Sequence, residues 1–147
     1  MMAKTNENVI VIPAKEKVFP IKVAAYYRVS DESDEQNGSF EAQIKYYKQY
    51  INENPEWILV GIYAEKATGT DFRKRKEFNR MIKDAKVGKI DIILTKSVTR
   101  FGRNTIPFLK NLRELSKSGA DVRFDLEDIN TIEQKDSSEI TLLAAIA

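Results

Sequence analysis

Short apolar runs alternate with amphipathic stretches along most of this sequence. Each run is four to eight residues long and rich in β-branched or aromatic side chains, as buried strands are. The predicted strands are Ile21–Tyr27, Trp57–Tyr63, Ile90–Thr95 and Ala120–Leu126. This alternation predicts an α/β domain of three layers, with a central, mostly parallel sheet of four to five strands flanked by helices.

Between these runs, apolar residues recur at the three- and four-residue spacing of one helix face. The predicted faces are Phe40, Ile44, Tyr47 and Ile51 in the first helix, Phe78, Met81, Ile82 and Ala85 in the second, and Phe108, Leu109, Leu112 and Leu115 in the third. Ser39 is a suitable N-cap for the first helix, and Gly88 and Gly119 are suitable residues to end the other two.

The two ends of the chain differ from the middle. Residues 1–20 are polar and lysine-rich apart from Val9–Ile12, and we expect a tail or an appended strand there. Residues 140–147 are apolar and end without a cap or a helix-breaking residue. We therefore expect residues 137–147 to start a helix that is cut short, whose apolar face is buried by a partner or a further domain.

The composition narrows the possible chemistry. The chain has 147 residues, enough for one domain with a proper core. It holds no cysteine and no histidine, which excludes disulfides, thiolate chemistry, Ser-His-Asp catalysis and nearly all zinc and copper sites. No apolar run is long enough to span a bilayer and no signal-peptide pattern opens the chain, so we expect a cytoplasmic protein.

Positive charge is concentrated rather than spread, since the formal net charge is only +2. One basic cluster is Arg73–Lys76, and a second follows the third predicted strand with Lys96, Arg100 and Arg103. A solvated face is the plainer explanation for the first cluster. The second cluster lies where reactive groups gather in parallel sheets, at the carboxyl ends of strands.

A hydroxyl and a guanidinium meet at the end of the first predicted strand. Because side chains alternate along a strand, Tyr26, Arg28 and Ser30 project to one side. The second strand leads to Glu65 and, beyond a loop, to Arg75. Arginine is a poor base, but it grips phosphate oxygens and neutralises charge on a transferring phosphoryl group. The pattern therefore predicts phosphoryl transfer to a serine, without a metal or another cofactor.

Each of these residues also has a plainer explanation. Ser30 can cap a turn, and Arg28 can pair with Glu65 across the sheet. The arginines after the third strand can be ordinary surface charges of a helix. The combination of all of them at strand ends, in a chain without histidine, favours a phosphate site.

Several sequence blocks stand in a fixed order along residues 21–147. They are Tyr26–Ser30, Ser39–Gln43, Glu65–Thr70 with Arg75–Phe78, Ile92–Asn104, and Phe124–Thr131 with Thr141–Ala147. In this order they resemble the serine site-specific recombinases, the resolvase/invertase family. The blocks correspond in turn to that family's nucleophile motif, its glutamine-bearing helix start, its acidic-loop and arginine segment, its paired arginines, and its hook and dimerising helix.

The resemblance implies a resolvase-like catalytic domain over residues 21–136, followed by the start of a long dimerisation helix. It implies that Ser30 is the nucleophile and forms a 5′-phosphoserine link to DNA. The implied phosphate-binding and transition-state arginines are Arg28, Arg75, Arg100 and Arg103. The implied supporting residues are Tyr26, Gln43 and Glu65, and the residues expected to contact DNA are Arg73, Lys74 and Lys96.

Members of this family recombine double-stranded DNA sites as a homodimer that pairs into a synaptic tetramer. They cut all strands, exchange them and rejoin them, with no metal, cofactor, small-molecule substrate or membrane. Thr99 stands where the small resolvases have an aspartate, and the loops after Ser30 and Glu65 are longer than theirs. These departures favour the large serine recombinases, such as phage or mobile-element integrases and transposon recombinases. They leave Lys96 and Glu65 as candidate proton-transfer groups.

Three other functions fit parts of the pattern. The first is a catalytically idle DNA-binding or assembly domain of the same fold. The second is a nucleotide- or phosphate-binding module, but the sequence contains neither of the glycine-rich phosphate-binding motifs. The third is a metal-dependent nuclease, whose acidic residues would cluster at successive strand ends, as they do not here.

Overall fold

The computed structural model describes residues 19–29, 39–66, 75–101 and 105–132. Its strands are β1 (Ile21–Val29), β2 (Trp57–Lys66), β3 (Ile92–Thr95), β4 (Asp121–Phe124) and β5 (Ile129–Asn130). Its helices are α2 (Ser39–Asn52), α3 (Lys76–Lys86), α4 (Val98–Phe101) and α5 (Thr105–Lys117). The predicted N-terminal tail and dimerisation helix lie mostly outside these residues and stay predictions.

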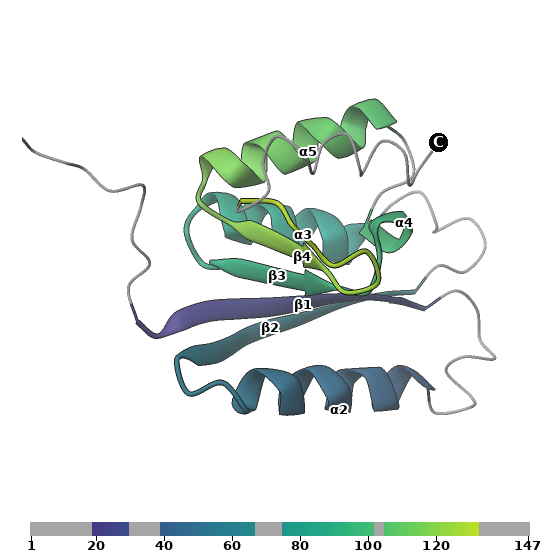
Figure 1. Cartoon of the computed structure of the whole chain (residues 1–147). Helices are drawn as coiled ribbons and strands as arrows, with labels where there is room; N and C mark the ends of the chain where they lie inside the picture. The colour runs from purple at the N-terminus through teal and green to yellow at the C-terminus, as the bar shows by residue number, and fades with distance from the viewer. Residues whose placement is uncertain (1–18, 30–38, 67–74, 102–104, 133–147) are drawn as a thin grey trace, which may run out of the picture.

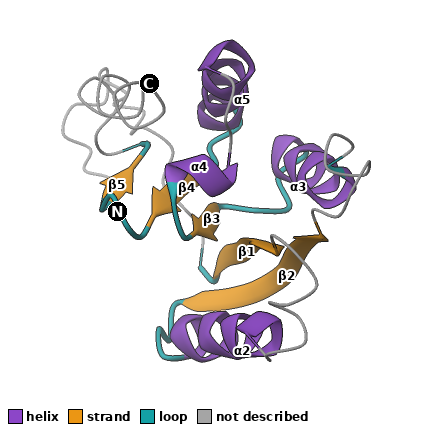
Figure 2. Cartoon of the chain, turned by 90° about the vertical axis from the view of Figure 1, so that its right-hand side faces the viewer, coloured by secondary structure: helices purple, strands orange, loops and turns teal. Residues whose placement is uncertain are grey.

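The strands form one sheet in the order β2-β1-β3-β4-β5. The first four strands are parallel, and β5 runs antiparallel to β4. Helix α2 covers one face of the sheet, while α3 and α5 cover the other (Figures 1 and 2). The predicted three-layer α/β fold with a mostly parallel sheet is therefore confirmed.

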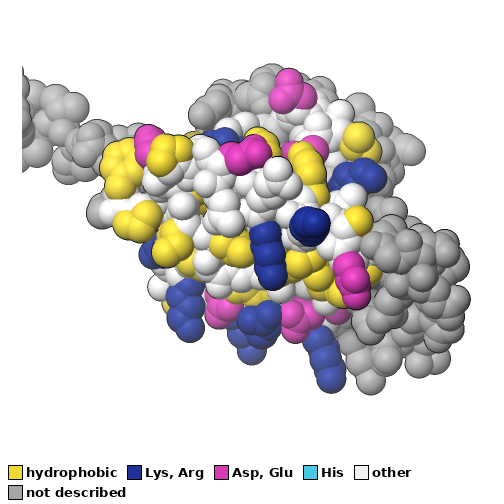
Figure 3. Space-filling model, turned by 90° about the horizontal axis from the view of Figure 1, so that it is seen from below, with side chains coloured by type: hydrophobic (Ala, Val, Ile, Leu, Met, Phe, Trp, Pro, Cys, Tyr) yellow, Lys and Arg dark blue, Asp and Glu magenta, His cyan; other side chains and the backbone are white. Residues whose placement is uncertain are grey.

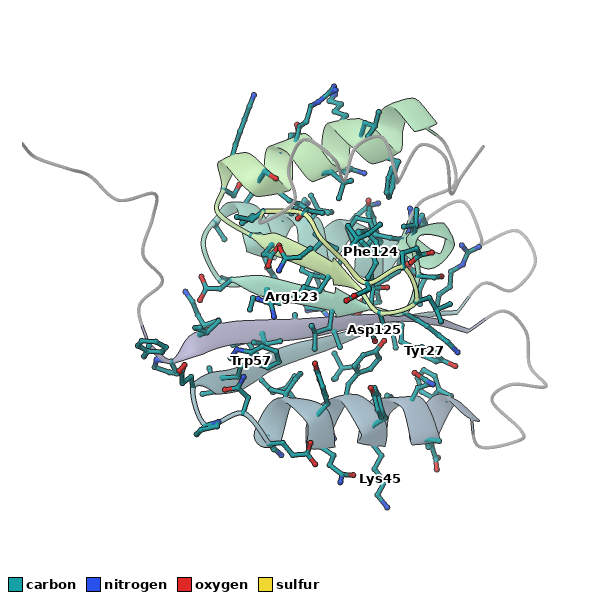
Figure 4. All side chains as sticks on the ribbon, viewed as in Figure 1. Tyr27, Lys45, Trp57, Arg123, Phe124 and Asp125 are labelled. Atoms are coloured by element: carbon teal, nitrogen blue, oxygen red, sulfur yellow. The ribbon has the colours of Figure 1, made fainter. Side chains whose placement is uncertain are left out.

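Two apolar cores lie on the two faces of the sheet. On the α2 side, Val23 and Ala25 pack with Tyr47 and Ile51. On the α3 and α5 side, Phe101 is fully buried, and its ring makes edge contacts with the rings of Tyr26, Phe78, Phe108 and Phe124. Figure 4 shows one side chain of each core, with Tyr27 of β1 directed to the α2 side and Phe124 of β4 to the opposite side.

The structure differs from the sequence-based boundaries at the strand ends. Strands β1 and β2 continue to Val29 and Lys66, because after a register shift between Val23 and Ala24 their backbones pair as far as those residues. Strand β5 lies beyond Leu126, where the last of the four predicted strands ends. Its polar residues are used in pairing, since the Val122 amide donates to the Thr131 hydroxyl and the Ile132 amide donates to the Asp121 carboxylate.

Left-handed backbone occurs at the turns between elements. The glycines that follow α3 and α5, Gly88 and Gly119, have φ angles of 84° and 85°, as predicted for helix-ending glycines. The turn between β4 and β5 puts Asp128 at φ 55°. A side chain with a Cβ atom is disfavoured there, although aspartate tolerates it better than most residues do.

We expect Asp128→Gly to stabilise the fold by about 0.5 to 1 kcal/mol, because glycine adopts this backbone conformation without a Cβ clash. Asp128→Ala is the matched control and should destabilise it, since alanine has the Cβ but not the short polar side chain. Chemical denaturation of the three proteins gives the order directly. An order in which alanine is as stable as glycine would contradict the strain at this turn.

Candidate active site

The carboxyl ends of the parallel strands meet at one edge of the sheet, which faces the viewer in Figure 2. The chain passes from β1 outward to β2 and then returns to β3 on the other side of β1. In open α/β sheets, ligands bind outside the carboxyl ends of the strands where the order reverses in this way. Here that point lies between β1 and β3, at Arg28 and Lys96.

Strand β1 directs Tyr26 toward α3 and α4, and the alternation of side chains along a strand puts Arg28 on the same side. Tyr26 belongs to the core on that side, whereas Tyr27 packs into the α2 core, so the predicted alternation is confirmed for these residues. Both side chains are largely enclosed, with 1% of Tyr26 and 7% of Arg28 exposed. Ser30 follows directly in the sequence but lies outside the described residues.

Arg75 reaches Tyr26 from the start of α3. Its backbone is left-handed, with φ 43° and ψ 50°, which turns the chain into the helix. Its guanidinium carbon lies 3.7 Å from the centroid of the Phe78 ring, a cation–π contact. One terminal nitrogen, Nη2, donates to the Phe101 carbonyl and lies 3.3 Å from the Tyr26 hydroxyl oxygen. Arg75 is thus oriented from several sides.

The charge of Arg75 also acts on the Tyr26 phenol. Burial raises the pKa of Tyr26 above its ordinary value of 10.0, while the positive charge of Arg75 opposes that rise. The phenol is therefore neutral near pH 7, and its oxygen accepts the hydrogen bond from Arg75. Nε of Arg75 is buried and has no acceptor among the residues that the structure describes.

Glu65 has a structural role in the described part of the site. Its carboxylate oxygens accept hydrogen bonds from the Glu77 amide, at 3.3 Å, and from the Phe78 amide, at 3.0 Å. Arg75, at the N-cap position of α3, supplies no side-chain cap itself. A carboxylate from β2 therefore satisfies the first amides of α3 and complements the positive end of the helix dipole.

The segment after β3 supplies the other side of the site. Lys96 is exposed at the strand end. The backbone of Arg100 is part of the short helix α4. The Arg100 side chain, like Arg73, Lys74 and Arg103 as a whole, lies outside the described part of the structure. Gln43 lies in the first half of α2, and no described contact joins it to Tyr26, Arg28 or Arg75.

Two groups that support the site could not be identified from the sequence. The Phe101 carbonyl, an acceptor for Arg75, belongs to a residue whose type indicates only a core position. Glu127 lies in the polar turn after β4, yet its carboxylate accepts a hydrogen bond from the Val98 amide at 3.1 Å. Both depend on contacts between distant segments, which periodicity does not report.

Three further features of the described residues are the charge distribution on the α2 side, the grouping of acidic side chains and the length of apolar helices. Figure 3 views the α2 side, where basic, acidic and apolar side chains are mixed, so the described residues of this face do not produce a field of one sign that would attract DNA. Among the described residues, no three acidic side chains are grouped as a cation site. None of the helices in the described segments is long and apolar enough to cross a bilayer.

Comparison with known proteins gives consistent relatives. The Tn3 transposon resolvase of Escherichia coli is 32% identical over 87 residues, covering 58% of this chain and 45% of that protein. The chain thus spans about half the length of the curated relatives that it matches.

Solved structures agree with these sequence matches. A resolvase-family site-specific recombinase from Streptococcus pneumoniae has a TM-score of 0.68 and 29% identity, over 85% of each chain. The N-terminal catalytic domain of TP901-1 integrase has a TM-score of 0.64 and 25% identity, over 85% of this chain and 92% of that one. Residues 23–147 match the family described as "Resolvase, N terminal domain". The chain belongs to this family.

Proposed function

We propose that this chain is the catalytic domain of a serine site-specific DNA recombinase, with Ser30 as the nucleophile. The observation that carries the proposal is the convergence of Arg28, Arg75 and Tyr26 at the strand end that leads directly into Ser30. A phosphate bound there meets guanidinium groups whose positions are set by the fold. Such preorganised donors stabilise charge as it develops in the transition state.

The proposed reaction is an exchange of one phosphodiester for another. The Ser30 hydroxyl gives up its proton as its oxygen bonds to a backbone phosphorus, the bond from phosphorus to the 3′ oxygen breaks, and the leaving oxygen takes up a proton as a 3′-hydroxyl. The reverse attack by a 3′-hydroxyl from another strand releases Ser30 and rejoins the DNA. The number of ester bonds is unchanged, so no nucleotide energy is consumed.

The arginines provide charge stabilisation and orientation in this proposal. Arg28 and Arg75 act from the described part of the site, and Arg100 and Arg103 act from α4 and the segment that follows. The double contact of Glu65 with the start of α3 favours a capping role over proton transfer. Lys96, exposed at the end of β3, is then the remaining proton-transfer candidate of the two.

Partners and setting follow from the proposed chemistry. The substrate is a pair of double-stranded DNA sites in the cytoplasm of a bacterium, and Arg73, Lys74 and Lys96 contact the DNA backbone. The active form is a homodimer that pairs into a synaptic tetramer. Further segments of a longer protein, of the integrase or transposon recombinase kind, select the DNA sequence.

Replacing Ser30 with alanine tests the nucleophile. The substrate is a duplex that the full-length protein selects from a random pool, carrying a nick near the scissile bond so that the covalent product accumulates. Wild-type protein should become attached to the 5′ end of the cut strand, and Ser30→Ala should bind the duplex nearly as well without cutting it. Cleavage by the mutant would refute the assignment, and a wild type that binds without cutting would indicate a catalytically idle domain.

A chelator separates this mechanism from that of a metal-dependent nuclease. Because guanidinium groups carry the charge stabilisation in the proposal, excess EDTA should leave the rate of covalent attachment unchanged. Loss of cleavage in EDTA, with recovery on adding Mg²⁺, would favour the nuclease. The Ser30→Ala protein serves as the blank in both conditions.

Arg75→Gln should lower the single-turnover cleavage rate on the order of 10²-fold or more, the usual cost of removing a preorganised transition-state donor. Arg80→Gln is the control in α3, the helix that Arg75 precedes, because Arg80 is exposed and pairs with Glu77 at 2.7 Å. It should cut at nearly the wild-type rate. Equal rates for the two variants would reduce Arg75 to a structural residue.

A further inference from the structure

Helix α4 is held in place from outside by the turn that follows β4. The Asp125 amide donates to the Thr95 carbonyl at 3.0 Å, and the Leu126 amide donates to the Lys96 carbonyl at 2.8 Å. The next residue in the turn is Glu127, whose carboxylate accepts the Val98 amide at the first residue of α4. Figure 1 shows this turn lying against α4 at the carboxyl edge of the sheet.

A helix of four residues needs such support. Helices this short are unstable in isolation, because fixing the first turn costs more than its single hydrogen bond returns. The amides at the start of a helix have no acceptor within the helix, so an outside oxygen must take them. A carboxylate is well suited, since its negative charge also complements the positive end of the helix. Glu127 meets this need for Val98.

The far end of α4 reaches the candidate active site. The carbonyl of Phe101, its last residue, accepts a hydrogen bond from the Arg75 guanidinium. Arg100 directly precedes Phe101, so its backbone moves with the same turn of helix. Since the Phe101 amide donates to the Ser97 carbonyl at 3.3 Å, the two ends of α4 are directly connected. A contact at Val98 is thereby linked to two arginines of the site.

We infer that Glu127 is a positioning residue for DNA cleavage, which acts by fixing α4 and through it Arg75 and Arg100. This inference rests on the proposed function. It assigns a catalytic consequence to a residue that lies in a turn between the last two strands and whose described contact is with the Val98 amide. The required property is a hydrogen-bond acceptor at that position, so glutamine replaces glutamate there with little loss.

The test compares Glu127→Ala, Glu127→Gln and Asp125→Ala in the full-length protein. Asp125→Ala is the control, because it removes a carboxylate from the same turn (Figure 4) while the backbone contact of residue 125 with Thr95 is retained. Three quantities are measured on the nicked duplex described above. They are the dissociation constant, the single-turnover cleavage rate at saturating protein, and the unfolding midpoint of each variant.

Glu127→Ala should lower the cleavage rate by about 10- to 100-fold, the range expected when a supporting contact of a catalytic group is lost. Its affinity for the duplex should stay within about threefold of wild type, because the phosphate-binding charges remain. Glu127→Gln and Asp125→Ala should both cut at close to the wild-type rate. Equal loss in the alanine variants, or no rescue by glutamine, would overturn the inference.

Hydrogen exchange supplies a readout that is independent of cleavage. The Val98 amide should exchange faster in Glu127→Ala than in wild type and should be unchanged in Asp125→Ala; unchanged exchange in Glu127→Ala would overturn the inference. A wild type that binds but does not cut would refute the proposed function instead, and exchange would still decide whether Glu127 fixes α4. If Glu127→Ala does not fold, Glu127→Asp, whose carboxylate is one methylene shorter, replaces it in both measurements.

Discussion

The orientation of the Arg75 guanidinium is the constraint around which the site is built. A guanidinium on a long side chain loses much conformational entropy when it is fixed, so its position has to be secured by several partners at once. Here the Phe78 ring, the Phe101 carbonyl and the Tyr26 hydroxyl surround it. These partners come from β1, α3 and α4, which all contribute to the core on one face of the sheet. The core and the site are therefore stabilised by the same contacts.

The fold could be predicted from the sequence because its signals are local. The apolar run from Ile21 to Tyr27 and the helix face of Phe78, Met81 and Ala85 each report burial within one element. Strand β5 and helix α4 have two and four residues, too few for a periodic pattern. Both exist because polar groups such as Asp121 and Glu127 pair across long sequence separations.

The site shows the same division between local and long-range signals. Alternation along β1 correctly placed Tyr26 and Tyr27 on opposite sides, and the reversal of strand order explains why the end of β3 lies beside β1. The role of Glu65 as a cap of α3 depends on the packing of β2 against the start of α3. No sequence motif indicates that packing. Arg28 and Glu65 also face each other in the β1–β2 register, so their pairing across the sheet stays a prediction beside this capping role.

The turn after β4 has a consequence for joining this domain to others. Residues 125–127 form hydrogen bonds with the start of α4 and the two residues at the end of β3, and the Ile132 amide donates to the Asp121 carboxylate. The structural unit therefore extends past the last parallel strand. A chimaera that exchanges C-terminal parts between related proteins and is spliced at Phe124 would keep four parallel strands but supply foreign support to α4. A splice placed after Ile132 transfers the domain together with the turn that supports α4.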